Sequence, residues 1–124
     1  MMTILNAKLV KNKLTWQSNS ITCQVDVEGI DQFLVDESKD LVFVLTGVGS
    51  KELASTSLFI YDQSGQQLKI NTNLPGHLYS HLVKNPRFGV TVVAQFQETY
   101  QGRYDWQLGL AEDGQLLIAV CPAM

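Results

Sequence analysis

Apolar and polar side chains alternate through most of residues 89–121, which is the pattern of β-strands with one buried face. A hairpin in the first part of this segment brings Ala94 opposite Trp106, so that a small side chain lies against a large ring. The other side of both strands is mostly polar, as in an antiparallel sheet with one solvated face. The apolar pairs of this hairpin would be Phe96 with Tyr104, Ala94 with Trp106, Val92 with Leu108 and Val90 with Leu110.

A second hairpin in the same segment has Asp113-Gly114 at its turn. This dipeptide is typical of type I′ turns, in which both central residues have positive φ. The turn carries the apolar face onto a third strand, so residues 89–121 are predicted to form a meander. Its cross-strand pairs would be Leu110 with Leu117, Leu108 with Ala119 and Trp106 with Cys121.

Earlier segments carry further strand patterns. Residues 57–70 are typical of a hairpin around Gly65, residues 21–27 alternate strictly, and residues 41–47 form an apolar run typical of a buried strand. We expect about nine or ten short, mainly antiparallel strands in the whole chain. The predicted fold is therefore one all-β domain over residues 1–124, built as a sandwich or a partly open barrel.

The segments FIYDQSGQQL and LGLAEDGQLL share a strand, an acidic turn, a glycine and a second strand. This layout occurs in β-propeller hairpins, but a whole propeller needs more blades than 124 residues hold. Aspartate and glycine suit such turns for reasons of local hydrogen bonding and backbone freedom. We interpret the similarity as shared turn chemistry.

One segment departs from the strand pattern. Residues 76–84 lie between Pro75 and Pro86 and are predicted to form a short helical connection. His77 and His81 are four positions apart, and two histidines on one helix face can bind zinc. The sequence has two histidines in all and lacks the H-E-x-x-H motif, so we expect a packing segment without metal or other cofactor. A metal-dependent enzyme that uses both histidines is kept as an alternative.

The chain has 45% hydrophobic and 17% charged residues and a net charge of −3, values typical of a globular domain. Its nine Lys and Arg residues form no basic stripe, and no apolar run approaches the ~20 residues that span a bilayer. We expect a cytoplasmic protein that binds neither nucleic acid nor membrane. Cys23 and Cys121 continue apolar faces and are expected to be reduced core residues, with a disulfide and the oligomeric state left open.

Acidic side chains are concentrated between residues 26 and 40, which hold six of the twelve acids and a single lysine. Such a segment is either a solvated face or a docking patch that captures a basic protein. An aromatic residue in the 98–102 turn is a second candidate contact. The predicted partner-binding residues are Asp26, Glu28, Asp31, Asp36, Glu37, Asp40 and Tyr100.

No set of catalytic side chains stands out in the sequence. There is no G-x-S-x-G motif, the serines lie mainly in polar turns, and nothing selects a pair of carboxylates. We therefore expect a binding protein and not an enzyme.

The segments LVFVLTG, SLFIYDQSGQQLKI and RYDWQLGLAEDGQLLIAV lie in a small acidic chain. Together they resemble the β-rich immunity proteins of bacterial contact-dependent growth inhibition and other polymorphic toxin systems. The resemblance implies a cytoplasmic inhibitor that binds one cognate toxin, commonly a nuclease, over its active site. It assigns no residue, so the interface residues named above depend on the charge pattern alone.

A β-barrel that holds a small apolar ligand is the main alternative, with Phe96, Tyr104 and Trp106 lining its cavity. The interior distinguishes the two functions. A solid core favours the inhibitor, whereas a cavity of roughly several hundred Å³ inside the sheet favours the ligand binder.

Overall fold

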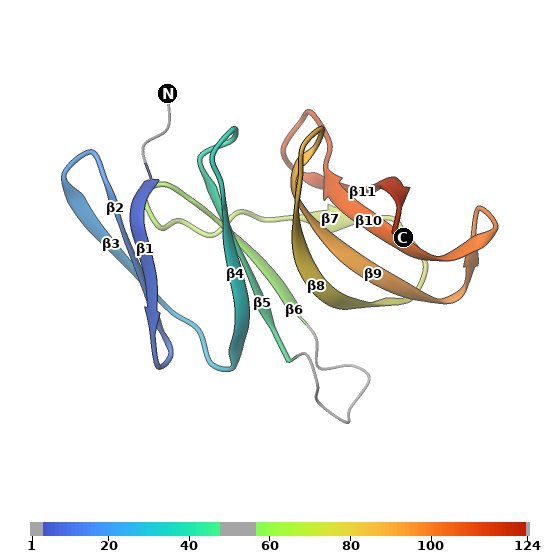
Figure 1. Ribbon diagram of the computed structural model, residues 1–124, viewed down its shortest axis with the longest axis horizontal. Helices are drawn as coiled ribbons and strands as arrows, with labels where there is room; N and C mark the ends of the chain where they lie inside the picture. Colours follow the sequence, from blue (N-terminus) through green and yellow to red (C-terminus); the bar gives the residue numbers. More distant parts are fainter. Residues whose placement is uncertain (1–3, 48–56, 124) are drawn as a thin grey trace.

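The computed structural model describes residues 4–47 and 57–123, and its strands form three sheets in chain order (Figure 1). Each sheet is an antiparallel meander, to which the last sheet adds one short parallel pairing between β11 and β7. The first sheet contains β1 (Ile4–Val10), β2 (Lys13–Ser18) and β3 (Ile21–Asp26). The middle sheet contains β4 (Ile30–Asp36), β5 (Leu41–Thr46) and β6 (Ser57–Asp62). The last sheet contains β7 (Asn71–Thr72), β8 (His77–Asn85), β9 (Gly89–Tyr100), β10 (Arg103–Leu110) and β11 (Leu116–Pro122).

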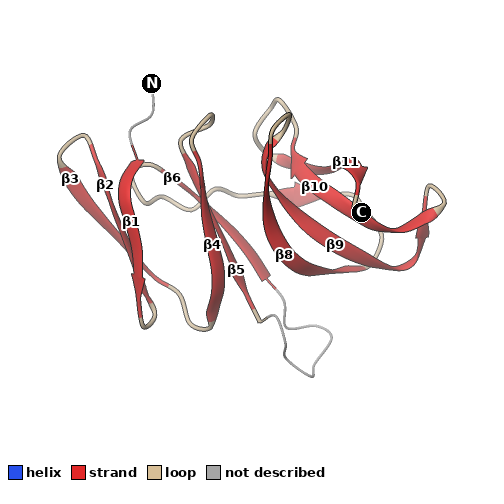
Figure 2. Cartoon of the chain, in the orientation of Figure 1, coloured by secondary structure: helices blue, strands red, loops and turns tan. Residues whose placement is uncertain are grey.

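The prediction of a mainly antiparallel all-β chain is confirmed (Figure 2). The helical segment predicted at residues 76–84 is wrong, because these residues belong to strand β8 and the residue before it. The described sheets stack in layers and do not close into a barrel, so the sandwich-like form of the prediction fits (Figure 1). Residues 4–47 and 57–123 include no helix that could cross a membrane.

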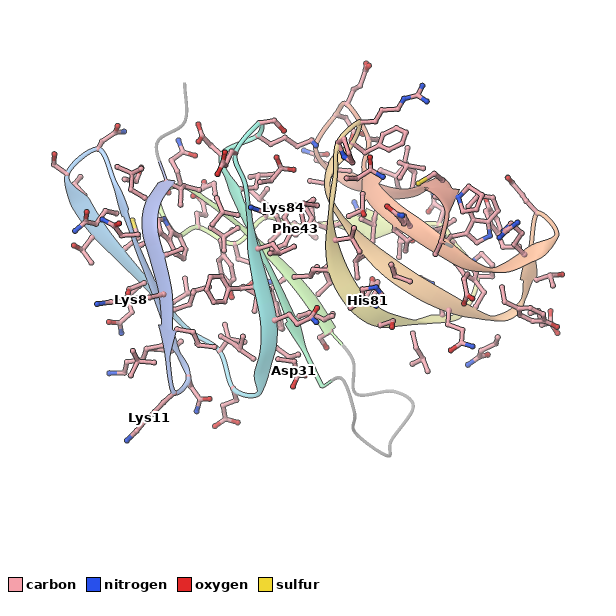
Figure 3. The ribbon with its side chains drawn as sticks, viewed as in Figure 1. Lys8, Lys11, Asp31, Phe43, His81 and Lys84 are labelled. Atoms are coloured by element: carbon pink, nitrogen blue, oxygen red, sulfur yellow. The ribbon has the colours of Figure 1, made fainter. Side chains whose placement is uncertain are left out.

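The middle sheet is buried on both faces. Val42 and Val44 of β5 pack with Trp16 and other residues of the first sheet, whereas Phe43 and Leu45 pack against the last sheet. These four β5 side chains are 0% exposed. Successive side chains of a strand point to opposite faces, so this one strand supplies both apolar clusters. Figure 3 shows Phe43 between the middle and last sheets.

Of the seven predicted cross-strand pairs of the last sheet, four are confirmed and two are wrong, while Val90 with Leu110 lies beyond the register of β9 and β10. A β-bulge between Arg103 and Asp105 changes the register, so Tyr104 does not pair with Phe96. A second bulge pairs Gln107 with Cys121 in place of the predicted Trp106. The confirmed pairs are Ala94 with Trp106, Val92 with Leu108, Leu110 with Leu117 and Leu108 with Ala119.

The hairpin predicted in residues 57–70 forms only next to its turn. Leu68 N donates to Ile60 O at 2.8 Å, and Tyr61 pairs with Gln67. Beyond this bridge the chain leaves the middle sheet and leads to β7 of the last sheet.

The two similar turns hold equivalent places in successive sheets. Asp62 ends β6, the third strand of the middle sheet, and Asp113 follows β10, the third strand of the β8–β11 meander. Asp62 Oδ1 accepts from Ser64 N at 2.9 Å, and Asp113 Oδ1 accepts from Gln115 N at 2.8 Å. Shared turn chemistry explains these contacts.

Both cysteine thiols are free. Cys23 is buried between the first and middle sheets, as predicted. The bulge in β11 places Cys121 beside Gln107, on the face of the last sheet that points away from the middle sheet. The core position predicted for Cys121 is therefore wrong.

Candidate interaction surface

The six acidic residues of the predicted docking patch fall into two groups separated by strand β4. A strand rises about 3.3 Å per residue, so the two ends of β4 are roughly 20 Å apart. Figure 3 shows Asp31 near one of these ends. The two groups are Asp26, Glu28 and Asp31 before or at the start of β4, and Asp36, Glu37 and Asp40 at or after its end.

Asp36 is a buried structural residue with an exposed fraction of 2%. Its Oδ1 accepts from the hydroxyl of Ser38 at 2.6 Å, and its Oδ2 accepts from Val90 N at 2.9 Å. Lys39 Nζ lies 3.3 Å from Oδ2 and also donates to Phe88 O at 2.8 Å. Asp36 therefore ties the β4–β5 turn to the β8–β9 turn and is not available to a partner.

The surroundings of Asp36 favour its charged form. Burial alone would raise the pKa of this carboxyl, but hydrogen bonds from Ser38 and Val90 and the nearby Lys39 ammonium lower the pKa below its ordinary value of 3.8. The carboxylate is thus ionised and fully used inside the protein at neutral pH.

Asp26 and Glu28 line a hollow of about 600 Å³ at the opposite end of β4. The hollow lies between the β1–β2 turn and the β3–β4 loop, which are joined by a hydrogen bond of 2.9 Å from Val27 N to Asn12 O. Val10 and Val27 form its apolar walls, and Val10 is 60% exposed. This volume lies within the range of about 300–1,000 Å³ that binding sites commonly occupy.

Two lysines share the rim of this hollow with the two acids. Lys13 pairs across the strands with Asp26, and Lys11 lies in the β1–β2 turn, at the tip of that hairpin in Figure 3. Asp31 is exposed on β4 near the same end of the molecule. The predicted acidic patch is therefore a mixed surface, in which acids and lysines surround an apolar centre.

The acids at the far end of β4 belong to other surroundings. Exposed Glu37 lines a hollow of about 320 Å³ together with Leu5 of β1 and Lys84 of β8. Asp40 is half-buried in the β4–β5 turn with φ of 53°. Neither residue can contact a ligand that sits in the hollow beside Val10 unless that ligand spans the length of β4.

Tyr100 is not an exposed residue at the tip of its turn. The tip is formed by Gln101 and Gly102, with φ of 50° and 82°. The ring of Tyr100 stacks on Phe96 at a centroid distance of 5.3 Å and meets Trp106 edge-on at 6.0 Å. Its place is on the core face of the last sheet, at the end of β9, whereas Val90, which binds Asp36, lies near the start of that strand.

The two histidines lie on opposite faces of β8. His77 pairs with Phe96 on the core face, and His81 pairs with Val93 on the outer face. A bulge between Tyr79 and His81 causes this reversal, because it adds one residue to an alternation of period two. In the part of the chain that is described, no three His, Cys, Asp or Glu side chains lie close enough together to hold a metal ion.

The aromatic residues predicted to line a ligand cavity do not surround one. Phe96 is 3% exposed within the core between the middle and last sheets, and Trp106 packs against that core. Tyr104 is 54% exposed. The arrangement is a packed layer with one outlying ring, so it gives no support to the barrel alternative.

Comparison of the chain with protein-family models, with curated proteins and with solved structures gave no match. Functional interpretation therefore depends on the geometry of the molecule itself.

Sequence reasoning missed the apolar centre of the mixed surface and the lysines on its rim. Leu9 and Val10 are adjacent apolar residues of one strand, so one of the two must face away from the core. That signal was present in the sequence. The contact between the β1–β2 turn and the β3–β4 loop could not be predicted from the sequence, because it depends on how β2 pairs with β3.

Proposed function

We propose that this chain is a protein-binding module of the immunity type, which blocks a cognate protein toxin in the cytoplasm. The observation that carries the proposal is the hollow beside Val10, whose apolar walls are surrounded by charged side chains. Protein interfaces have this arrangement, with an apolar centre that excludes water and a polar rim that sets orientation. We assign Val10 and Val27 to the centre of the interface.

The acidic side of this surface suits a toxin with a basic active site. Asp26, Glu28 and Asp31 carry carboxylates that can occupy the positions of nucleic-acid phosphates in such a site. Opposite charges also accelerate encounter between the two proteins, and this acceleration weakens as salt is added. Lys11 and Lys13 require that the partner present an anionic group as well, which adds selectivity.

The test is a binding experiment with the product of the adjacent gene in catalytically disabled form. Surface plasmon resonance would compare the natural chain with Val10→Ser and with the double variant Asp26→Asn/Glu28→Gln. We expect the Val10 variant to dissociate about tenfold faster, because it loses a desolvated anchor. The double variant should associate several-fold more slowly and show a flatter dependence on salt.

The matched control is Glu98→Gln/Glu112→Gln, which removes two exposed acids from the last sheet. This variant should bind like the natural chain if the interface is the hollow beside Val10. Equal effects of both double variants would show a general charge effect and reject the assigned surface. A failure of the adjacent gene product to bind would reject the immunity function itself.

A further inference from the structure

The last sheet has an outer face that points away from the middle sheet. Val93 pairs with His81 on β8 and with Gln107 on β10. The neighbours of these residues along each strand point to the core, so these three side chains point to the outer face. Val120 lies at the β11 bulge, and its side chain covers Gly109. A Cβ added to Gly109 would lie 3.4 Å from Val120 Cγ1. Four partly exposed aliphatic residues make up the apolar part of this face, namely Val83, Val93, Ile118 and Val120.

Polar groups in the centre of this face bind one another. Gln107 Oε1 accepts from Asn85 Nδ2 at 3.0 Å and from Thr91 Oγ1 at 2.9 Å, and Asn85 Nδ2 lies 3.7 Å from Cys121 Sγ. Thr91 is 0% exposed although it belongs to the outer face. Because these groups already have partners, covering the face costs less than covering free polar groups.

The outer face of the first sheet is different. Its central row pairs Lys8 with Thr15 and Thr15 with Gln24, and the next row pairs Lys13 with Asp26. The exposed apolar residues of this face, Leu5 and Val10, lie in other rows, and Val10 belongs to the hollow already assigned to a different partner. The two outer faces therefore differ at their centres, where the first sheet is polar and the last sheet carries Val93.

We propose that a second copy of the chain covers the last sheet, so that two outer faces pack against each other about a twofold axis. A twofold axis parallel to β9 places β8 of one copy over β10 of the other. His81 of each copy then lies over the Gln107 position of its partner and the two Val93 side chains face each other, so the central row of the face is complementary to itself.

The size of the face sets the strength of this association. Strands β8 to β11 contain seven to twelve residues each. At ordinary strand spacing, they offer about 500 Å² per copy, so the dimer buries about 1,000 Å² in total. This is the lower limit for a specific interface, and we expect a reversible dimer with a Kd of about micromolar order.

Sedimentation velocity of the full chain at concentrations from about 1 μM to about 100 μM tests the proposal. The mass should rise from 13.8 kDa to twice that value as the concentration increases. Val93→Lys should keep the chain monomeric throughout the range, because it places a charge in the centre of the interface. The matched control Thr15→Lys places the same charge on the outer face of the first sheet and should leave dimer formation unchanged.

A milder variant distinguishes loss of the dimer from loss of the fold. Val93→Thr should keep the thermal unfolding temperature close to that of the natural chain and weaken the dimer by about tenfold, since each copy loses one buried methyl group. The thiol reagent reaction of Cys121 should also slow as the dimer forms. A monomeric mass at all concentrations, or a dimer that survives Val93→Lys and dissociates with Thr15→Lys, would overturn the proposal.

Discussion

The carboxylate of Asp36 accepts a hydrogen bond of 2.9 Å from the backbone nitrogen of Val90, a residue 54 positions away. This contact joins the end of β4 in the middle sheet to the start of β9 in the last sheet. Lys39 strengthens it by binding both the carboxylate and Phe88 O in the β8–β9 turn. An acid that resembles a surface charge in the sequence is thus a link between two layers.

Replacing Asp36 with asparagine should destabilise the protein by about 2–4 kcal/mol, because the amide group turns a donor toward Ser38 or Val90 and leaves Lys39 without its counter-charge. Urea unfolding monitored by circular dichroism would measure the loss. The control is Asp113→Asn, at an exposed turn with two backbone hydrogen bonds, for which we expect a much smaller loss. Similar losses for both variants would contradict the role of Asp36.

Acid should weaken the natural protein through the same residue. The pKa of Asp36 in the folded state is below its ordinary value of 3.8, so the ionised carboxylate contributes stability that is complete above this value. That contribution is lost as the pH falls from 3.8 toward the lower folded-state pKa. Urea midpoints measured between about pH 7 and about pH 3 should therefore fall less steeply for Asp36→Asn than for the natural chain.

Gly89 should not accept a side chain. Its φ is 78°, and a Cβ at this position would overlap Asp36 Oδ2 and lie 2.9 Å from Lys39 Nζ. We expect Gly89→Ala to cost about 2–4 kcal/mol of stability, from backbone strain and from displacement of the buried pair. Gly102→Ala provides the comparison, since φ is 82° there and the added Cβ meets no atom within 4 Å. It should cost about 1 kcal/mol, and an equal cost at both glycines would refute the packing argument.

Trp16 should report on the contact between the first and middle sheets. The indole is 1% exposed, and its Nε1 donates to Gln63 O at 2.8 Å. Trp16→Phe keeps most of the apolar volume but removes the donor, so we expect a loss of about 1–3 kcal/mol. Thermal unfolding monitored by fluorescence would measure this loss of stability. The control is Trp106→Phe, because Trp106 is only partly buried. An unchanged unfolding temperature for Trp16→Phe would show that this hydrogen bond contributes nothing.

The last meander could be predicted because its information is local. The turn is not the predicted type I′, because Gly114 has a positive φ and Asp113 does not, but the alternation on both sides of it still fixes the pairs of Leu108 and Leu110. The strand class of residues 41–47 followed from their apolar run for the same reason. Short-range geometry and side-chain pattern were sufficient in these places.

Strand β8 could not be predicted in this way. An unbroken strand would place residues 77, 79, 81 and 83 on one face, but the bulge before His81 puts Leu82 on the core face with His77 and Tyr79. Leu78 and Leu82 are four positions apart, a spacing typical of one helix face, which explains the wrong prediction, but the bulge puts them on opposite faces of the strand. The role of Asp36 was equally hidden, because its partner Val90 becomes a neighbour only when two sheets pack together.

Strand β5 has no exposed face, and neighbouring residues on it belong to different apolar clusters. The outer sheets can each change on their solvent side without affecting the other. A single inserted residue in β5 would exchange its two sets of side chains and disturb both clusters together. Over evolutionary time, β5 should therefore tolerate substitution by similar apolar residues and reject insertions and deletions, while length variation gathers in the turns of the two outer sheets.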